Sequence, residues 1–298
     1  MTATLAETTA SSLVFFHGQT PLHPGAGTAV GVVDLPIQRE RHTQWPTIPG
    51  SSIKGVFRDA CRDDADPAAW TSVFGPETEN ADKHAGALSL TDARLLAFPV
   101  RSLHGVFAYA TCRAALQRMR RDLGLVGKAD QVPVPPPIPV GQALVAQGAP
   151  VLVGSEEMVL EEFDFGVTDW PELGSLAERL AGWISADPEF AAEFVPRLVV
   201  LDDDHFTHFA RHATEVVARI KLDYERKTVS RGALFYQEFL PAETVMYSLL
   251  IARPSRDGSG KSAADVLNYV RNRLPVVLQL GGDETTGKGF CHVHVADV

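Results

Sequence analysis

The order of apolar and polar positions predicts a mixed protein in which buried strands alternate with amphipathic helices. Apolar or alternating stretches that are typical of strands lie at 13–16, 87–98, 103–110, 151–165, 245–251, 276–280 and 290–295, with a turn expected near Pro99. Apolar residues recur at helical spacing over 51–62, 113–123, 172–194, 203–219 and 263–274, and one of Asp202–Asp204 caps the fourth of these helices. We therefore predict the α+β class.

The first five predicted elements follow the order strand, helix, strand, strand, helix, with which a ferredoxin-like core begins. We predict a single domain over 13–298, with its core at 13–123 and 241–298 and a large insertion at about 124–240. Residues 1–12 have no apolar run and are expected to form a disordered extension. The proline-rich stretch PVPPPIP at 133–139 is interpreted as a stiff surface connector rather than a ligand for a partner.

Composition bounds the class of protein without deciding its function. Hydrophobic residues make up 45% and charged residues 21% of the 298 residues, as in ordinary globular proteins. The formal net charge of −10 argues against a uniformly basic nucleic-acid protein, although basic residues gather between 38 and 62. The three scattered cysteines, the absence of a signal-like start and the lack of a long apolar run favour a cytoplasmic protein without a membrane span.

Residues 21–49 form a long loop that we expect to be functional, because such loops are uncommon in compact domains. The helix after this loop is expected to begin with Ser51 or Ser52 as its N-cap. Its Lys54, Arg58 and Arg62 recur every four residues beside the buried stripe. Since the amides at a helix start favour anions, we predict a phosphate there. The alternative is a solvated basic face on an ordinary core helix.

Three blocks of sequence carry a resemblance to a known family. They are VVDLPIQRERHTQWPTIPGSSIKGVFRD at 32–59, FGPETENADKHAGALSLTDARLLAFPVRSLHGVFAYAT at 74–111 and LGGDETTGKGF at 280–290, together about a quarter of the chain. In this order they resemble the backbone RAMP proteins of type III-B CRISPR effector complexes, which are called Cmr complexes. The flanking sequence fits the same family more loosely from about Val14 onward.

The resemblance implies a ferredoxin-like (RRM-type) RAMP core with a large insertion and a β-hairpin thumb that kinks the duplex of guide and target RNA. Copies of such a protein stack into a helical filament along the guide (crRNA). They assemble with other Cmr subunits, including the large polymerase-like subunit. The family cuts the bound target RNA at regular intervals as an endoribonuclease that depends on a divalent metal, for which we expect Mg²⁺.

The resemblance also assigns the candidate catalytic residues. The family's catalytic aspartate falls on Asp34, which would also hold the metal, and a histidine of its active site falls on His23. Asp34 could act as general base toward a ribose 2′-OH or hold a metal-bound water, although by position alone it is a turn or cap residue and His23 shapes a turn. Glu238 is a further catalytic candidate, in a stretch where Gln237 and Phe239 depart from the paired acids and the tyrosine of some family members.

Candidate RNA-binding residues lie in the long loop, in the helix after it, in a predicted hairpin and in the C-terminal glycine-rich loop. They are Arg39, Arg41, His42, Ser51, Lys54, Arg58, Arg226, Lys227 and Lys288. The hairpin of 217–224 and 233–240 is the preferred thumb, because Arg226, Lys227 and Arg231 at its tip could meet an RNA backbone. The stretch at 151–165 is the second choice, since its carboxylates would repel phosphate.

Other motifs are weaker. GDETTGK at 282–288 resembles a Walker A loop, but Gly289 stands where the magnesium-binding hydroxyl belongs, so we do not expect a nucleotide site. HFARH at 208–212 lacks the glutamate of HExxH, and the set Asp202–Asp204, His205, His208 and His212 is interpreted as a capped surface helix. His292 and His294 lack a visible third ligand and are interpreted as structural. Two alternatives to a nuclease stay open: a non-catalytic RNA-binding scaffold of the same filament, and an unrelated acidic RRM-like module.

Overall fold

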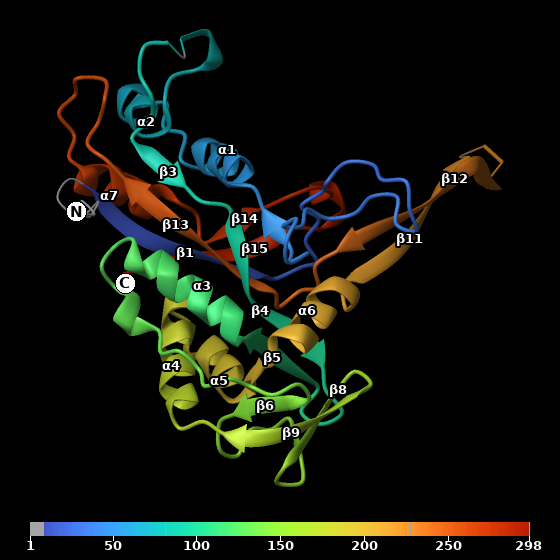
Figure 1. Ribbon diagram of the computed structural model, residues 1–298. Coiled ribbons are helices and arrows are strands. Elements are labelled where there is room, and N and C mark those ends of the chain that lie inside the picture. The colour runs from blue at the N-terminus through green and yellow to red at the C-terminus, as the bar shows by residue number, and fades with distance from the viewer. Residues whose placement is uncertain (1–8, 81, 224, 227, 298) are drawn as a thin grey trace.

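The computed structural model describes residues 9–80, 82–223, 225–226 and 228–297. Its centre is a set of four antiparallel strands, which cross the sheet in the order β15 (Phe290–Ala296), β1 (Ala10–Gly18), β13 (Val245–Ala252) and β4 (Ala93–Arg101) (Figure 1). Helix α1 (Gly50–Ala60) follows β1, and α7 (Ala263–Arg273) follows β13. The central elements therefore run β1, α1, β4, β13, α7 and β15 along the chain, with β5 to β12 inserted between β4 and β13.

The strand between β1 and β4 comes from late in the chain. The predicted strand at 103–110 is β5 (Phe107–Cys112), which pairs with the outer side of β4, and α3 (Arg113–Gly124) follows it. The place beside β1 belongs to β13, which pairs with it in unbroken register from Ala10↔Ala252 to His17↔Val245. The turn predicted near Pro99 is wrong, because Pro99 lies inside β4 opposite Tyr109 and the chain turns at 102–106.

Further strands extend the sheet to either side. Beyond β4 lie, in order, β5, β10 (Leu198–Leu201), β6 (Gln142–Val145), β9 (Phe163–Asp169), β8 (Glu157–Leu160) and β7 (Leu152–Val153). β14 (Val277–Gln279) pairs with β15, β2 (Thr47–Ile48) with β4 and β3 (Leu88–Leu90) with β13, and 3₁₀ turns lie at Thr78–Asn80, Ala129–Gln131 and Glu284–Thr286. The strand-like stretch predicted at 151–165 is thus divided among β7, β8 and β9.

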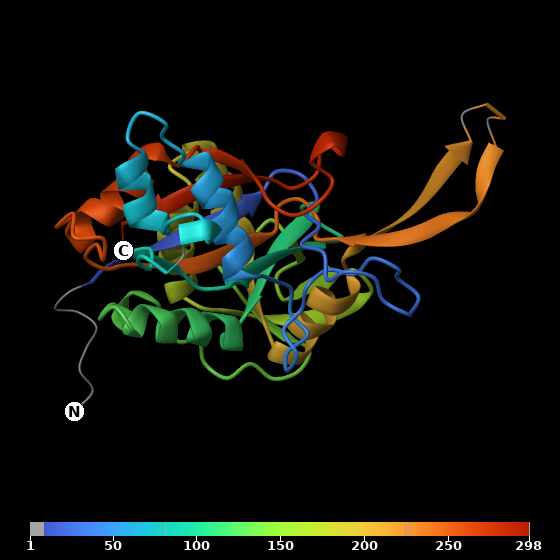
Figure 2. The ribbon, with the colours of Figure 1, turned by 90° about the horizontal axis from the view of Figure 1, so that it is seen from above.

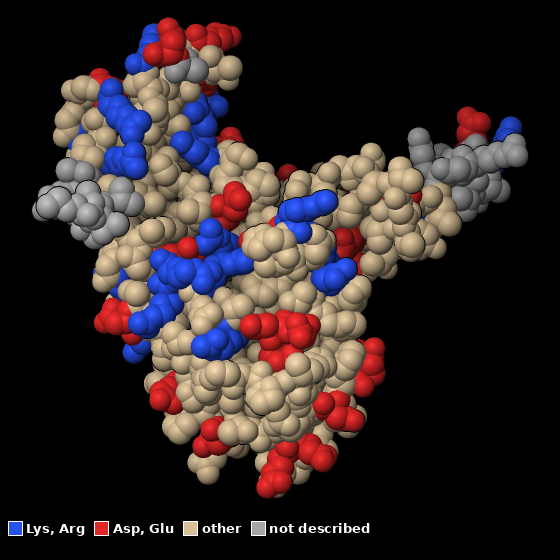
Figure 3. All heavy atoms as spheres, viewed as in Figure 1, with Lys and Arg blue, Asp and Glu red and all other residues tan. Residues whose placement is uncertain are grey.

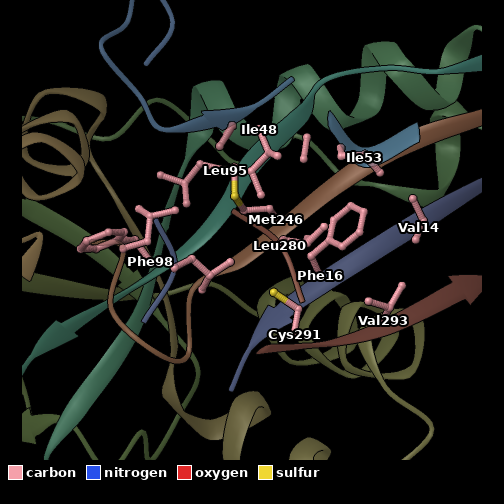
Figure 4. Close-up of a cluster of buried hydrophobic side chains, with 14 of the residues drawn as sticks. Val14, Phe16, Ile48, Ile53, Leu95, Phe98, Met246, Leu280, Cys291 and Val293 are labelled. Atoms are coloured by element: carbon pink, nitrogen blue, oxygen red, sulfur yellow. The ribbon is translucent and has the colours of Figure 1, made fainter. Parts of the chain in front are cut away.

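Alternate residues of β1 face opposite sides of the sheet, and each side carries its own core. Val14 and Phe16 pack with α1 and α7, in the cluster that Figure 4 draws around Ile53 and Met246. On the other side, Leu13 and Phe15 pack with α3, α4 (Glu172–Ile184) and α5 (Pro188–Arg197). Helices α2 (Pro67–Phe74) and α6 (Asp203–His212) extend the first core. Burial on both faces accounts for the continuous apolar runs of β1 and β13.

A two-stranded hairpin of β11 (Glu215–Asp223) and β12 (Thr228–Phe239) extends away from the body (Figure 2). The pairing confirms the predicted hairpin, in which Arg219 lies opposite Phe235. The predicted helix at 203–219 is too long, because α6 ends at His212 and β-branched residues such as Val216 and Ile220 belong to β11. The predicted cap is confirmed, since the Asp202 carboxylate accepts from the backbone N–H groups of Asp204 and His205.

The N-terminal extension is shorter than predicted. β1 begins at Ala10, so the expectation of disorder is wrong for residues 10–12, while residues 1–8 lie outside the described part of the chain. All three cysteines are free and buried, as their spacing indicated. Within the described residues, no helix has the length and apolar character that crossing a membrane requires.

Replacing Phe57 with alanine tests the core around α1. The Phe57 side chain is fully buried, and its ring lies 6.2 Å from that of Phe16. Because the truncation leaves a cavity between α1 and β1, we expect Phe57→Ala to lower the free energy of unfolding by about 3–5 kcal/mol in urea titrations. Leu125→Ala, at a half-exposed position after α3, is the control and should change it by less than about 0.5 kcal/mol. Similar losses in both variants would contradict this packing.

Glu243 should make the stability of the protein sensitive to acid. Its carboxylate accepts from the Tyr109 hydroxyl at 2.6 Å and lies 2.6 Å from His17 Nε2. Burial alone would raise the pKa of Glu243, but the contacts with His17 and Tyr109 outweigh burial and the pKa is lowered overall. A lowered pKa in the folded state stabilises the protein above the unfolded pKa, and this contribution is lost as the pH falls through the folded pKa.

The corresponding test compares wild type with Glu243→Gln in unfolding titrations from neutral pH to about pH 3, a range that spans the ordinary glutamate pKa of about 4.3. The difference in unfolding free energy should be largest near neutral pH and should shrink in acid. Exposed Glu178→Gln serves as the control and should show a small difference throughout. A gap that grows as the pH falls would contradict the assignment.

Candidate functional site

Residues 235–240 hold the long loop in place where the hairpin meets the body. They comprise the end of β12 and Leu240 directly after it, and we call this segment the β12 base. Leu22 and Leu240 exchange backbone hydrogen bonds of 2.9 and 2.8 Å at one end of the loop. Further along the loop, the N–H groups of Asp34 and Leu35 both donate to the Tyr236 carbonyl at 3.1 and 3.0 Å. The Glu238 N–H donates in turn to the Leu35 carbonyl at 3.0 Å. The loop thus forms an added edge on β12.

The Asp34 carboxylate is oriented by this edge. Its Oδ2 accepts from the Tyr236 N–H at 2.7 Å, in addition to the backbone contacts between the same two residues. Among the described residues no hydrogen bond reaches Oδ1, and Asp34 is only half-buried. One carboxylate oxygen is therefore fixed while the other is available to a ligand.

His23 is buried beside the same strand. Its Nδ1 lies 2.7 Å from the carbonyl oxygen of Glu238, and because a carbonyl only accepts, Nδ1 carries the proton. In the neutral imidazole the other nitrogen, Nε2, is the acceptor, and Gly25 leaves it room, since a Cβ at Gly25 would lie 2.8 Å from it. The ring of His23 packs against Phe239 with centroids 5.5 Å apart. The structure thus fixes the position of this imidazole and places a proton on Nδ1.

The glycine-rich loop after β14 closes over the His23 backbone. The Gly282 N–H donates to the His23 carbonyl at 3.0 Å, and Gly281 has a φ of +85°, where a side chain would collide with that carbonyl. The glycine-rich loop, the long loop and the start of α1 surround a hollow of about 240 Å³. It is lined by Pro24, Gly25, Gln38, Ile48, Pro49, Ser52, Gly281 and Gly282. The first and third of the three sequence blocks therefore meet at one concave surface.

Glu238 lies on the opposite side of β12 from this hollow and is bound by the protein itself. Oε1 lies 2.6 Å from Arg39 Nη2 and 2.8 Å from the Thr214 hydroxyl, and Oε2 accepts from the Ile37 N–H at 3.0 Å. The side chains of Glu238 and Arg39 are only 8% and 16% exposed. Because three donors occupy this carboxylate, its geometry suits positioning of the loop better than contact with a reacting atom.

Several predicted RNA-binding side chains contact the protein instead of solvent. Arg39 also donates to the carbonyls of Gln44 and Ala210, both at 2.8 Å. Lys54 donates to the Leu88 carbonyl at 3.0 Å, and burial, followed by the nearby Arg58, lowers the pKa of Lys54. Arg58 donates to the Gly75 carbonyl at 2.9 Å and stacks over the Trp70 ring. Lys54 and Arg58 thus fix segments around α1, and Arg39 joins the long loop to α6 and β12. A phosphate would have to compete with these contacts.

The remaining candidates are more accessible. Arg41, Ser51 and Arg226 are exposed, and the side chain of His42 is 74% exposed. Lys288 lies in the glycine-rich loop with Nζ 5.4 Å from the centre of the Phe239 ring. Lys227 lies outside the described residues. In Figure 3, Lys and Arg lie over α3 and around α1 and α2, whereas Asp and Glu occupy the end of the molecule near β8 and β9.

The start of α1 differs from its predicted cap. The helix begins at Gly50 after Pro49, without a side-chain cap from Ser51 or Ser52. The Asp92 carboxylate, which comes from the turn before β4, instead accepts from the Gly50 N–H at 2.7 Å. A carboxylate at this position occupies one of the amides that a phosphate would use and opposes the negative charge of that phosphate. No local sequence pattern indicates this cap, because it arises from a tertiary contact.

The metal-binding capacity of the site is small. Among the described residues, no group of three or more His, Cys, Asp or Glu side chains is placed to hold a metal ion. In the set around α6, His205 pairs with the capping Asp202 at 2.8 Å, which agrees with the interpretation as a capped helix. Magnesium can be held by one or two carboxylates together with substrate phosphates. Asp34, with its available oxygen, fits such an ion when an RNA phosphate supplies the further ligands.

Residues to which the sequence assigned no role also build the site. Phe239 is fully buried and contacts His23, and the backbone of Tyr236 fixes Asp34. Arg219 and Gln237 both donate to Asp283 of the glycine-rich loop, at 2.8 and 2.5 Å. The alternation of side chains along β12 could have shown that Gln237 and Glu238 face opposite ways. Nothing in the sequence indicated which loop each would meet.

Comparisons with known proteins agree with one another. Residues 15–292 match the family model described as the RAMP superfamily. A Pyrococcus furiosus protein named CRISPR system Cmr endoribonuclease Cmr4 is 36% identical over 292 residues, 96% of each chain. A Saccharolobus solfataricus protein named CRISPR system CMR subunit Cmr4 is 27% identical and covers 93% of each.

Solved structures show the same fold. The crystal structure of oligomeric Cmr4 from Pyrococcus furiosus superimposes with a TM-score of 0.75 at 29% identity, covering 97% of this chain and 98% of that one. A chain in the cryo-EM structure of the type III-B Cmr-beta complex bound to cognate target RNA reaches a TM-score of 0.75 at 22% identity, covering 96% and 97% of the two chains. At that identity the second likeness concerns the fold alone.

Arg39→Ala tests whether the pair of Arg39 and Glu238 fixes the loop. The truncation leaves a buried carboxylate without its cation, so we expect the free energy of unfolding to fall by about 3–5 kcal/mol in urea titrations. The matched control is Arg41→Ala two residues later, where the side chain is exposed and the change should stay below about 0.5 kcal/mol. Equal effects of the two substitutions would contradict the buried role of Arg39.

Proposed function

The chain belongs to the RAMP superfamily, in the family of Cmr4 proteins, and from this premise we propose that it is a backbone subunit of a type III-B CRISPR effector complex. In this role it binds guide RNA and cleaves complementary target RNA as an endoribonuclease that depends on a divalent metal. The observation that carries the proposal is the Asp34 carboxylate, with one oxygen fixed by the Tyr236 N–H and the other available. The name of the 36% identical relative, a Cmr endoribonuclease, points the same way.

We further propose a ferredoxin-like core and a thumb. The chain order β1, α1, β4, β13, α7, β15 and the strand order β15, β1, β13, β4 support the core assignment. The hairpin of β11 and β12 is the thumb candidate, because it leaves the body and exposes Val216, Ile220, Leu234 and Tyr236. A two-stranded ribbon with exposed apolar side chains is marginal alone in water, so contact with RNA or a neighbouring subunit would stabilise it.

The RNA backbone is proposed to follow the hollow between the His-Pro-Gly turn at 23–25, the start of α1 and the glycine-rich loop. Glycines at 25, 281 and 282 allow close approach of a backbone, and the Ser52 side chain also lines this surface. Lys288, Arg41 and His42 lie in the two loops concerned and could contact phosphates as the RNA enters or leaves. The small number of available cations at this surface agrees with the net charge of −10. Assembly into a filament would distribute RNA binding over several copies.

Asp34 is assigned the role of proton acceptor. With Oδ2 held, Oδ1 would accept the proton of the attacking oxygen, either a ribose 2′-OH or a water, as a general base. His23, with its proton on Nδ1, presents Nε2 as an acceptor that could orient the substrate. In the alternative role, Oδ1 would hold a divalent ion together with an RNA phosphate, and that ion would stabilise the negative charge that develops at the phosphate.

The proposed partners are guide and target RNA, further copies of this chain and other Cmr subunits, including the large polymerase-like subunit. The similar solved structures, an oligomeric Cmr4 and a Cmr complex bound to target RNA, support these partners. Free buried cysteines are consistent with action in the reducing cytoplasm. The second candidate is a non-catalytic scaffold in the same filament, which is favoured by the lack of a multidentate metal site among the described residues.

Asp34→Asn separates the two candidates. The amide oxygen can still accept from the Tyr236 N–H, so the loop should stay in place while the base is lost. In a complex reconstituted with guide RNA and magnesium, we expect cleavage of end-labelled complementary RNA to fall by at least about 100-fold, with guide and target binding unchanged. Addition of a chelator should abolish the regularly spaced wild-type products.

The matched control is Asp64→Asn, at a side chain that is 89% exposed, which should cleave like wild type. Binding of target RNA without cleavage by the wild type would leave the scaffold as the function. A parallel loss of RNA binding in Asp34→Asn would make Asp34 a structural residue.

A further inference from the structure

Three side chains meet where the hairpin joins the glycine-rich loop, and we call them the junction clamp. Arg219 of β11 donates from Nη1 to Asp283 Oδ1 at 2.8 Å, and Gln237 of β12 donates from Nε2 to Asp283 Oδ2 at 2.5 Å. Asp283 lies in the loop between β14 and β15. One carboxylate therefore links both strands of the hairpin to a loop that is distant in the sequence.

The clamp is built into the fold. Gln237 is only 4% exposed, and the side chains of Arg219 and Asp283 are 25% and 19% exposed. Asp283 adopts a φ of +67°, a left-handed conformation that aspartate and asparagine tolerate better than other residues with side chains. Hydrogen bonds to a carboxylate that is largely shielded from water are stronger than neutral ones. These features distinguish the clamp from a solvated surface ion pair.

The neighbours of the clamp are the candidate catalytic groups. Gln237 lies between Tyr236, whose N–H holds Asp34, and Glu238, whose carbonyl holds His23. The guanidinium of Arg219 lies 5.4 Å from the centre of the Phe239 ring, which also packs against His23. Because Tyr236 and Glu238 are covalently bonded to Gln237, a displacement of Gln237 would also shift the backbone groups that hold Asp34 and His23.

We propose that Gln237 and Asp283 are positioning residues, which hold the hairpin and the glycine-rich loop at a fixed angle so that Asp34 and His23 meet the bound RNA in one geometry. This inference rests on the proposed nuclease function and deepens it. Small displacements of a catalytic group strongly reduce the rate, because the reacting atoms must already lie near the attack geometry. The clamp acts through the neighbouring residues and makes no contact with the reacting atoms itself.

A pair of substitutions tests the clamp. Gln237→Glu places a second carboxylate next to Asp283 and replaces the hydrogen bond by repulsion between like charges. Adding Asp283→Asn restores a donor and acceptor pair between the same two positions, and asparagine tolerates the left-handed backbone. In the reconstituted complex under single-turnover conditions, we expect Gln237→Glu to cleave at least about tenfold more slowly than wild type. The double variant should recover most of that loss.

The pH profile supplies a readout that general loss of structure would not move. In Gln237→Glu the new carboxylate faces Asp283 and Arg219. Lys288 and His23 lie nearby, both against the Phe239 ring. The Glu238 carboxylate points away from this group and pairs with Arg39. Two adjacent carboxylates can share a proton, which restores a hydrogen bond between them. The ratio of wild-type to variant cleavage rates should therefore narrow as the pH is lowered from about 8 to 6. A constant ratio would contradict the proposal.

Gln117→Glu on α3 is the matched control, because it makes the same change near Arg113 and away from the clamp, and it should cleave like wild type. Wild-type cleavage by Gln237→Glu, or an equal loss in the single and double variants, would overturn the proposal. If the wild-type complex itself does not cleave, the proposed function fails. In that case amide hydrogen exchange at Asp34, Leu35 and Glu238 tests whether the clamp holds the loop. Exchange should be faster in Gln237→Glu than in wild type and should return to the wild-type rate in the double variant.

Discussion

Backbone hydrogen bonding along the β12 base is the constraint on which the site depends. A two-stranded ribbon that leaves the body has an open edge, and buried backbone groups on that edge need partners. The long loop supplies them at Leu22 and again at Asp34 and Leu35. Because the loop pairs with a strand of fixed direction, the half-buried Asp34 has a defined orientation although it belongs to no regular element.

The alternation of side chains along β12 then distributes the connections. Gln237 faces the glycine-rich loop and Glu238 faces Arg39 and the end of α6, while the Glu238 carbonyl meets His23. Elements near residues 23, 34, 210 and 283 are thus held by three consecutive residues of one strand. In this arrangement hydrogen bonds connect the hairpin, the long loop and the glycine-rich loop, so a displacement of the hairpin would change the geometry at Asp34.

Local sequence patterns predicted the elements well where a single face or strand decides them. The strands at 13–16 and 245–251, the hairpin around residue 225 and the Asp202 cap follow from apolar runs, β-branched residues and a capping side chain. Such patterns could not predict which strand pairs with β1, because β5 and β13 are both apolar and the choice depends on long-range register. The cap of α1 by Asp92 is likewise a contact between distant parts of the sequence, so a local pattern does not predict it.

The candidate site was predictable only in part. The family resemblance pointed to Asp34 and His23, and the structure places both beside β12. Arg39 in the long loop and Lys54 and Arg58, from their helical spacing, were expected to contact RNA. All three instead donate to carbonyls or carboxylates within the protein. A periodic row of cations shows which face of a helix they share but not whether loops from elsewhere cover that face.

A structure of the assembled complex with guide RNA and a target carrying a 2′-deoxy nucleotide at the cleavage position would test the central claim most directly. The account predicts that the scissile phosphate lies next to Asp34 and is linked to its carboxylate through one metal ion or one water, and that the RNA backbone follows the hollow between the turn at 23–25 and the glycine-rich loop. A scissile phosphate remote from Asp34, or RNA bound on the opposite face of the sheet beside α4 and α5, would contradict it.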